Sequence, residues 1–246
     1  MALIEVERAI LCVCFKDEVP EGLLAELGDR RSWLAYRELV RDRLRKELSV
    51  ALPRTRRVLG DVAIEAAFRR QLDQTPPRSR FFRDVVLELV KSALHTWRAD
   101  YELAPWGADL AAYEAAIWEV SDIDARTPEP REFGFERAPL LSPALRLLTL
   151  AYPVHQGADS AGRYAQGEHF LGVYRAADDE RPRTWTMNRS THSLLTMWQS
   201  DPQLTVSEAV RALSRLRGFV VDEAFIDGLC GVLAEFLDAG ILLGSR

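Results

Sequence analysis

The chain has few residues whose types and spacing are typical of a catalytic or metal site. Its four histidines are scattered along 246 residues, at His95, His155, His169 and His192. They form no His-x-x-Glu-His pattern, and the sequence has no paired Cys-x-x-Cys spacing, glycine-rich phosphate loop or Gly-x-Ser-x-Gly elbow. Glu114 and Glu119 lie on an expected helix without an obvious partner, and we interpret them as surface residues. We therefore predict no catalytic residue, no metal ligand and no cofactor in this chain.

The three cysteines do not change this expectation. Cys12 and Cys14 are separated by one residue, so on a strand they would share a face, but nothing nearby completes a ligand set. We interpret them as buried structural thiols. With Cys230 they make an odd, sparse set, which predicts no disulfide framework and fits a reducing cytosol. Because no apolar run approaches the ~20 residues that cross a bilayer, we expect a cytoplasmic protein without a membrane segment.

Charge is unevenly distributed along the chain. The formal net charge is -5, which argues against a general affinity for nucleic acid. Residues 28–100 nevertheless carry 17 Lys and Arg against 10 Asp and Glu, a balance of +7 that leaves -12 for the rest. This segment is either a basic face for nucleic acid, an acidic peptide or a partner subunit, or a solvated helix surface rich in arginine.

The first half of the sequence predicts a helical bundle. Amphipathic or strongly helix-forming patterns occur in SWLAYRELVRDRLRKELSV, DVAIEAAFRRQLDQ, RFFRDVVLELVKSALHTW and ADLAAYEAAIWEVSD. Pro53 should end or bend the first of these helices, Asp61 should cap the second, and the Pro76-Pro77 pair should close it. Short loops between such helices favour a bundle, which we place at residues 1–125.

The composition changes after the bundle. The segment DIDARTPEPREFGFERAP contains three prolines, and we assign residues 126–165 to a linker and connecting segment. Within it, ALRLLTLAYPVHQ fits either a strand or a short helix, because its periodicity does not decide. The stretch HFLGVYRAADDERPRTWTMN then predicts two strands joined by a polar turn.

The last 60 residues carry the clearest local signals. Asn188 and Asp222 are expected helix caps, and Thr205 with Glu208 forms a capping box. Gly240 should end the last helix before a short strand. Because three small helices cannot bury their apolar faces alone, the preceding strands must pack on them. We therefore predict a mainly α protein with a smaller α+β part, in which residues 166–246 form a winged-helix-like domain.

This C-terminal region resembles the RiPP recognition element, a domain that binds the leader of ribosomally made, post-translationally modified peptides. The resemblance rests on Met187-Asn188 at the start of a helix, on the stretch from Thr205 to Glu208, and on Gly240 to Leu242 at the end. The sequence departs from the pattern at residues 200–203, Ser-Asp-Pro-Gln, where a glycine-containing turn is usual.

The rest of the chain is similar to partner proteins of multinuclear non-haem iron oxidative enzymes, such as those of methanobactin and thiaglutamate biosynthesis. The order of YRELVRDRL, FRRQLDQTPPRSRFFRDVV, DLAAYEAAIWE and LLSPALRLLTLAYPV carries this resemblance. It implies a non-catalytic subunit that binds the leader of a precursor peptide and presents its cysteine to the iron enzyme. The iron then belongs to the enzyme, the two proteins form a heterodimer, and the bundle contacts the enzyme. The product, an oxazolone and thioamide pair or a peptide from which a cysteine carbon is removed, stays open.

A recognition element holds its leader by strand addition, so the resemblance also implies a site. The exposed edge would lie at Arg183, Thr184, Trp185 and Thr186. Phe225 and Leu229 would line the groove beside the third helix. Trp185 is either an anchor for the leader or a core residue, and a core role is also open for Phe225 and Leu229.

A winged-helix transcriptional regulator is the alternative. The helix in TVSEAVRALSRLRG offers Arg211, Arg215 and Arg217, but few of the Asn, Gln or Ser side chains that accompany base readout. We therefore do not expect nucleic acid as a partner. No set of catalytic residues in the sequence supports a third possibility, a free-standing enzyme.

Overall fold

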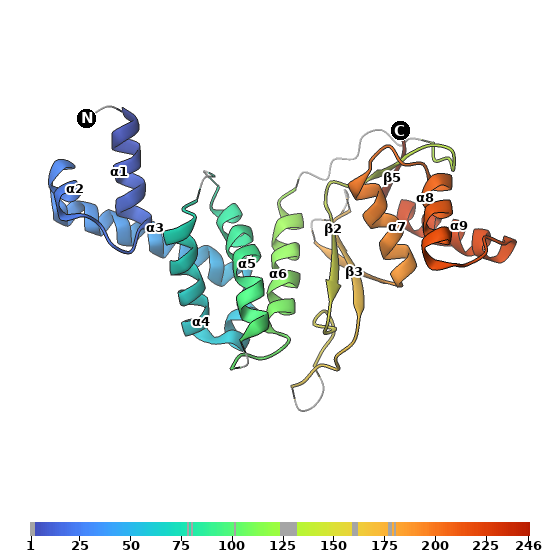
Figure 1. The fold of residues 1–246 in the computed structure, drawn as a ribbon, viewed down its shortest axis with the longest axis horizontal. Coiled ribbons are helices and arrows are strands. Elements are labelled where there is room, and N and C mark those ends of the chain that lie inside the picture. The colour runs from blue at the N-terminus through green and yellow to red at the C-terminus, as the bar shows by residue number, and fades with distance from the viewer. Residues whose placement is uncertain are drawn as a thin grey trace. The chain divides into compact units, whose positions relative to one another are not determined.

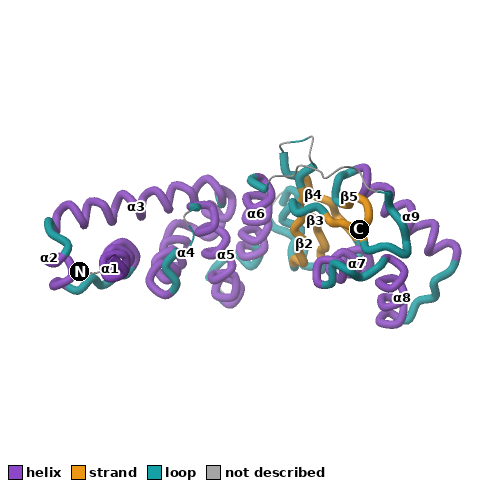
Figure 2. The backbone as a smooth tube through the Cα atoms, turned by 90° about the horizontal axis from the view of Figure 1, so that it is seen from above, coloured by secondary structure: helices purple, strands orange, loops and turns teal. Residues whose placement is uncertain are grey.

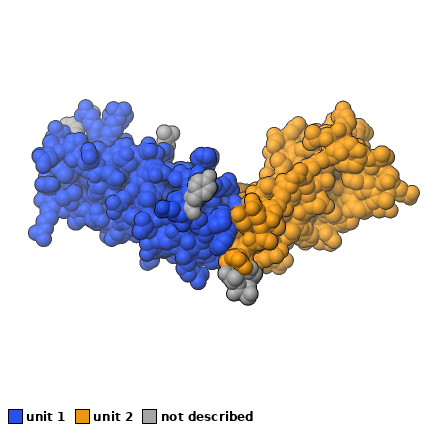
Figure 3. Space-filling view, turned by 60° about the horizontal axis from the view of Figure 1, so that its bottom comes forward, with its two compact units in different colours: residues 1–115 blue, residues 116–246 orange. Residues whose placement is uncertain are grey.

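The computed structural model describes residues 3–77, 79, 81–100, 102–123, 132–158, 162–176, 179 and 181–246. The chain divides into two compact units, Met1–Ala115 and Ala116–Arg246 (Figure 3). The first unit is helical, and the second combines helices with antiparallel strands (Figure 1). The expectation of a mainly α protein with a smaller α+β part is confirmed.

Helices build the first unit. They are α1 (Leu3–Phe15), α2 (Glu21–Glu26), α3 (Arg30–Ala51), α4 (Pro53–Gln74), α5 (Phe82–Ala99) and α6 (Gly107–Ser121), the last of which continues into the second unit. Pro53 separates α3 from α4, as predicted, because its ring suits the first position of a new helix. Gly60 interrupts α4 with a φ of 80°, which a glycine adopts without steric cost. Asp61 follows this kink, where a helix start was expected.

The long helix α3 organises the bundle, because α1, α4 and α5 all pack against it (Figure 2). The core between them consists of fully buried apolar side chains, including Val13, Leu44, Leu48, Phe68, Leu72, Val86 and Leu89. Cys12 and Cys14, which we interpreted as buried structural thiols, both lie in α1 and not on a strand. Helical geometry turns them apart, so that Cys14 is buried and Cys12 is partly exposed.

Glu114 and Glu119 are not the solvated surface residues that the sequence indicated. Glu114 is only 6% exposed, and its carboxylate accepts hydrogen bonds from the backbone N–H groups of Arg54, at 3.0 Å, and Thr55, at 2.9 Å. These amides open α4, so Glu114 caps a helix 60 residues away along the chain. Glu119 forms an ion pair of 2.8 Å with Arg146.

Much of the arginine excess in residues 28–100 is satisfied inside the first unit. Arg45 donates two hydrogen bonds to Glu65, at 2.9 and 3.1 Å. Arg41 is buried and donates to the backbone carbonyls of Cys14 and Phe15, at 2.9 and 3.0 Å. Arg41 and Arg45 therefore serve contacts within the first unit and do not belong to a solvated arginine surface.

In the described residues, the second unit contains two small sheets and three helices besides the end of α6. The strands are β1 (Pro139–Leu141), β2 (Leu145–Leu150), β3 (His169–Tyr174), β4 (Arg183–Met187) and β5 (Leu242–Ser245), and the helices are α7 (Arg189–Ser200), α8 (Val206–Arg217) and α9 (Glu223–Asp238). Strands β2, β3 and β4 form an antiparallel sheet in that order, and β1 pairs with β5. The predicted strand–turn–strand unit is confirmed as β3 and β4.

The expected linker at residues 126–165 is wrong for the part that the structure describes. This range contains β1 and β2, and β2 pairs with β3 along its whole length. Two of the three prolines that suggested a linker, Pro128 and Pro130, lie in residues 124–131, outside the described residues, and the third, Pro139, begins β1. The ambiguous apolar segment that follows is a strand, because tertiary pairing decides where periodicity does not.

The predicted helix boundaries of the second unit are confirmed. Asn188 and Asp222 accept from backbone N–H groups at the starts of α7 and α9, both at 2.8 Å, and Thr205 with Glu208 forms the capping box of α8. Gly240 follows α9 with a φ of 71°. The N–H of Ile241 then donates to the carbonyl of Phe236 at 2.9 Å, which closes the helix end before β5.

Candidate functional site

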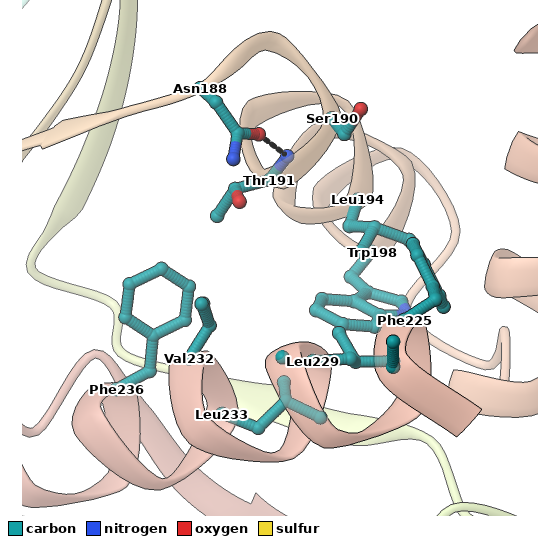
Figure 4. Close-up of a pocket in the computed structure, with 12 residues that line it drawn as sticks. Asn188, Ser190, Thr191, Leu194, Trp198, Phe225, Leu229, Val232, Leu233 and Phe236 are labelled. Carbon is teal, nitrogen blue, oxygen red and sulfur yellow. Dashed lines mark hydrogen bonds between the residues drawn. The ribbon is translucent and has the colours of Figure 1, made fainter. Parts of the chain in front are cut away.

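An apolar groove lies between α7 and α9 (Figure 4). Its volume is about 330 Å³, a size typical of a site for a few apolar side chains. Its lining residues are Asn188, Ser190, Thr191, Leu194, Trp198, Ala224, Phe225, Gly228, Leu229, Val232, Leu233 and Phe236. Most of this surface is apolar, and the polar groups gather at the start of α7.

The wall from α9 follows directly from helical spacing. Phe225, Leu229, Val232 and Phe236 recur every three or four residues, so they share one face of the helix. Leu229 and Phe236 are buried in the domain core, whereas Phe225 and Val232 are partly exposed. This stripe therefore packs against the core along part of its width and lines the groove with the remainder.

The wall from α7 has polar groups at the start of the helix and apolar groups in the turns that follow. The Asn188 side chain caps the helix by accepting from the N–H of Thr191, which holds the first turn at the mouth of the groove (Figure 4). Leu194 and Trp198 follow at helical spacing and are buried. The indole N–H of Trp198 is buried and has no hydrogen-bond partner among the described residues. An unsatisfied buried donor is unusual in a protein interior.

Among the described strands, β4 pairs only with β3, so it is an edge strand of the three-stranded sheet. The N–H of Arg175, just after β3, donates to the carbonyl of Ala144, just before β2, at 3.1 Å. This hydrogen bond shows that the odd-numbered residues of β3 direct their backbone N–H and C=O groups toward β2. The even-numbered residues of β3 therefore direct theirs toward β4. Thr184 and Thr186 oppose odd-numbered residues. Their backbone groups therefore both point to the outer edge, where an added strand would pair.

Trp185 connects this strand to the groove wall. Its ring meets that of Phe236 edge-on at 5.5 Å between centroids, and it also approaches Tyr174 at 6.5 Å. Trp185 is partly buried and packs against the core of the second unit. The core interpretation of Trp185 is therefore favoured over that of a free anchor.

The structure brings together only part of the predicted site. Phe225 and Leu229 line the groove, and their role in peptide binding stays a prediction. Arg183 is exposed at the far end of β4 and binds Asp179 at 2.8 Å. The Thr186 hydroxyl lies 3.3 Å from Nε2 of His155. The contribution of α7 was missed, although the spacing of Thr191, Leu194 and Trp198 after a helix cap could have indicated it.

Burial sets the electrostatics beside the groove. Burial lowers the pKa of His192 in the first turn of α7, while Glu168 acts in the opposite direction. The His192 ring rests on that of Phe170 at 5.0 Å. Burial, followed by the nearby His169, also lowers the pKa of His155. Both imidazoles therefore favour the neutral form in the folded state.

The described residues contain no group of three or more His, Cys, Asp or Glu side chains placed to hold a metal ion. Within the same residues, no helix combines the length and apolar character needed to span a membrane.

An antiparallel sheet with an outer edge strand, followed by helices that form an apolar groove, makes a module that can hold an extended peptide segment. Residues 142–237 match the model of a family described as the HvfC C-terminal domain. This family is associated with partner proteins of enzymes that modify ribosomally made peptides. The matched range covers less than half of the chain, but it includes β4 and every residue that lines the groove. The chain has no match among curated proteins.

Proposed function

We propose that this chain is a non-catalytic partner subunit that binds the leader of a ribosomally made precursor peptide. In this proposal it presents the cysteine of that peptide to a multinuclear non-haem iron enzyme, which carries the iron and performs the oxidation. The observation that carries the proposal is the groove between α7 and α9, which lies wholly within the region matched by the HvfC C-terminal domain.

The chemistry of the groove supports a peptide ligand. Its apolar walls suit the side chains of a leader, and the outward-facing backbone groups of Thr186 on β4 suit pairing with the leader backbone. Strand pairing supplies affinity with little dependence on sequence, so the groove would select among leaders through its apolar contacts. The first unit is then available to bind the enzyme.

Leader binding tests this function. The leader of the precursor encoded beside this chain, carrying a fluorescent label, is titrated with the full chain and followed by anisotropy. We expect saturable binding that unlabelled leader displaces and that a scrambled leader does not. The full chain, mixed with the iron enzyme, should also elute as a heterodimer in size-exclusion chromatography. Absence of leader binding by the folded chain, alone and with the enzyme, would reject the proposal.

A parallel titration separates the proposal from the transcriptional alternative. On α8, Arg217 donates to the hydroxyl of Ser193 at 2.9 Å, so one of its three arginines already serves a contact within the domain. A duplex from the promoter of the surrounding genes should bind only weakly at physiological salt. Specific binding at about 10 nM, as typical DNA-binding regulators show, would instead support a regulator.

A further inference from the structure

The first unit carries an exposed strip of aromatic, aliphatic and cationic side chains along α3 and the start of α5. We name Tyr36, Leu39, Arg43, Phe81, Phe82 and Arg83 the α3–α5 strip. Leu39 is 68% exposed, and the three aromatic residues are 43 to 48% exposed. Single exposed apolar residues are common on soluble proteins, but a contiguous group marks an interaction surface.

The contacts between these residues make the strip continuous. Leu39 lies one helical turn before Arg43 on α3. The Arg43 guanidinium then lies over the ring of Phe82, 5.6 Å from its centroid, which joins α3 to α5. The Arg83 guanidinium lies over the ring of Phe81 at 5.3 Å. The strip is thus an apolar surface on which a guanidinium lies over each of two aromatic rings.

The two guanidiniums determine the chemistry of a suitable partner. Arg43 forms an ion pair with Glu47 at 3.0 Å, and Arg83 with Asp84 at 3.4 Å. The Arg43 guanidinium has five N–H donors, so the Glu47 carboxylate does not exhaust its capacity. A surface that combines carboxylates with aliphatic side chains would therefore complement the strip.

We propose that the α3–α5 strip is the docking surface for a different protein with an acidic, aliphatic face, and that this protein is the iron enzyme of the proposed function. A second copy of this chain is a poorer occupant. A two-fold symmetric dimer through the strip would bring like guanidiniums together, and contact with an acidic region of another copy would leave an open-ended assembly. The inference rests on the proposed function, because that function supplies the partner.

Substitutions at Leu39 test both the place and the charge of this surface. Leu39 is exposed on α3, so Asp and Lys differ there mainly in the sign of the charge they introduce. Binding of the full-length variants to the iron enzyme is measured by calorimetric titration. Leu39→Asp should weaken binding about 30-fold by repelling an acidic face, whereas Leu39→Lys should change it less than about threefold. Val62→Asp, at an 86% exposed position on α4, is the matched control and should bind as wild type does.

Leader binding and thermal melting of each variant show that the rest of the chain is intact. Equal binding by Leu39→Asp and wild type would overturn the strip as the docking surface. Equal losses for Leu39→Asp and Leu39→Lys would overturn the acidic partner face. A change confined to self-association, measured by sedimentation velocity, would overturn the enzyme as the occupant. If the wild type itself does not bind the enzyme, the heterodimer of the proposed function is rejected. If the wild type and Leu39→Asp bind equally, only the strip is rejected, so the two claims fail by different results.

Discussion

Truncation of Phe225 to alanine should weaken leader binding and cost the fold only a modest part of its stability. Phe225 is partly buried, lines the groove, and stacks on Phe219 with ring centroids 4.8 Å apart. Removing a fully buried phenylalanine costs about 3 to 5 kcal/mol of folding free energy. Because part of the Phe225 ring is already exposed, we expect a loss of about 1 to 2 kcal/mol, including the aromatic pair.

The effect on binding is expected from the exposed part of the same ring. Loss of a central apolar contact costs about 1 to 3 kcal/mol of binding free energy, or roughly 5- to 150-fold in Kd. Anisotropy titration of the leader and urea unfolding, on Phe225→Ala and wild type, measure the two effects separately. Leu216→Ala, at a position on α8 that is 76% exposed and outside the groove, should change neither quantity. Unchanged leader affinity in folded Phe225→Ala would refute the assignment of this wall to the leader.

Three further predictions concern the edge strand, a buried carboxylate and a titrating histidine. Thr186→Pro should abolish leader pairing because it removes an outward-facing N–H. Thr186→Ala keeps that N–H and should bind the leader as wild type does. Binding of the leader by folded Thr186→Pro with wild-type affinity would exclude pairing at this edge. Glu114→Gln should lower the free energy of unfolding by about 1 to 3 kcal/mol, because it weakens the cap on the amides of Arg54 and Thr55. The control Glu119→Gln, at a partly exposed ion pair, should lower it by less than about 1 kcal/mol in the same urea titration. Because the pKa of His192 is lowered in the folded state, its stabilising contribution is complete above the ordinary value of 6.5 and is lost as the pH falls through the folded pKa. The Tm should therefore decrease from pH 7 to pH 5, and less steeply in His192→Gln; parallel pH profiles would contradict this role.

Features encoded locally could be predicted from the sequence. The caps at Asn188 and Asp222 and the capping box at Thr205 depend on residues three positions away, and the β3–β4 unit depends on two strands and a polar turn. The face of α9 also follows from spacing alone, which is why Phe225 and Leu229 could be placed together on it.

Features that depend on distant residues could not be predicted. The amides capped by Glu114 lie 60 residues away along the chain, so nothing near Glu114 indicates that it is buried. The pairing of β1 with β5 joins Pro139 to Ser245, and proline-rich composition nearby favoured a linker instead. The α7 wall of the groove was missed because Leu194 and Trp198 read equally well as core residues, and they are buried.

Turnover of the precursor peptide tests the central claim most directly. The iron enzyme is incubated with the full-length precursor peptide under oxygen, with and without this chain, and the mass of the peptide is followed by mass spectrometry. We predict that the peptide is modified at its cysteine only when wild-type chain is present, and that removing the leader from the peptide abolishes the modification. Equal modification without this chain would contradict its role as the subunit that presents the peptide.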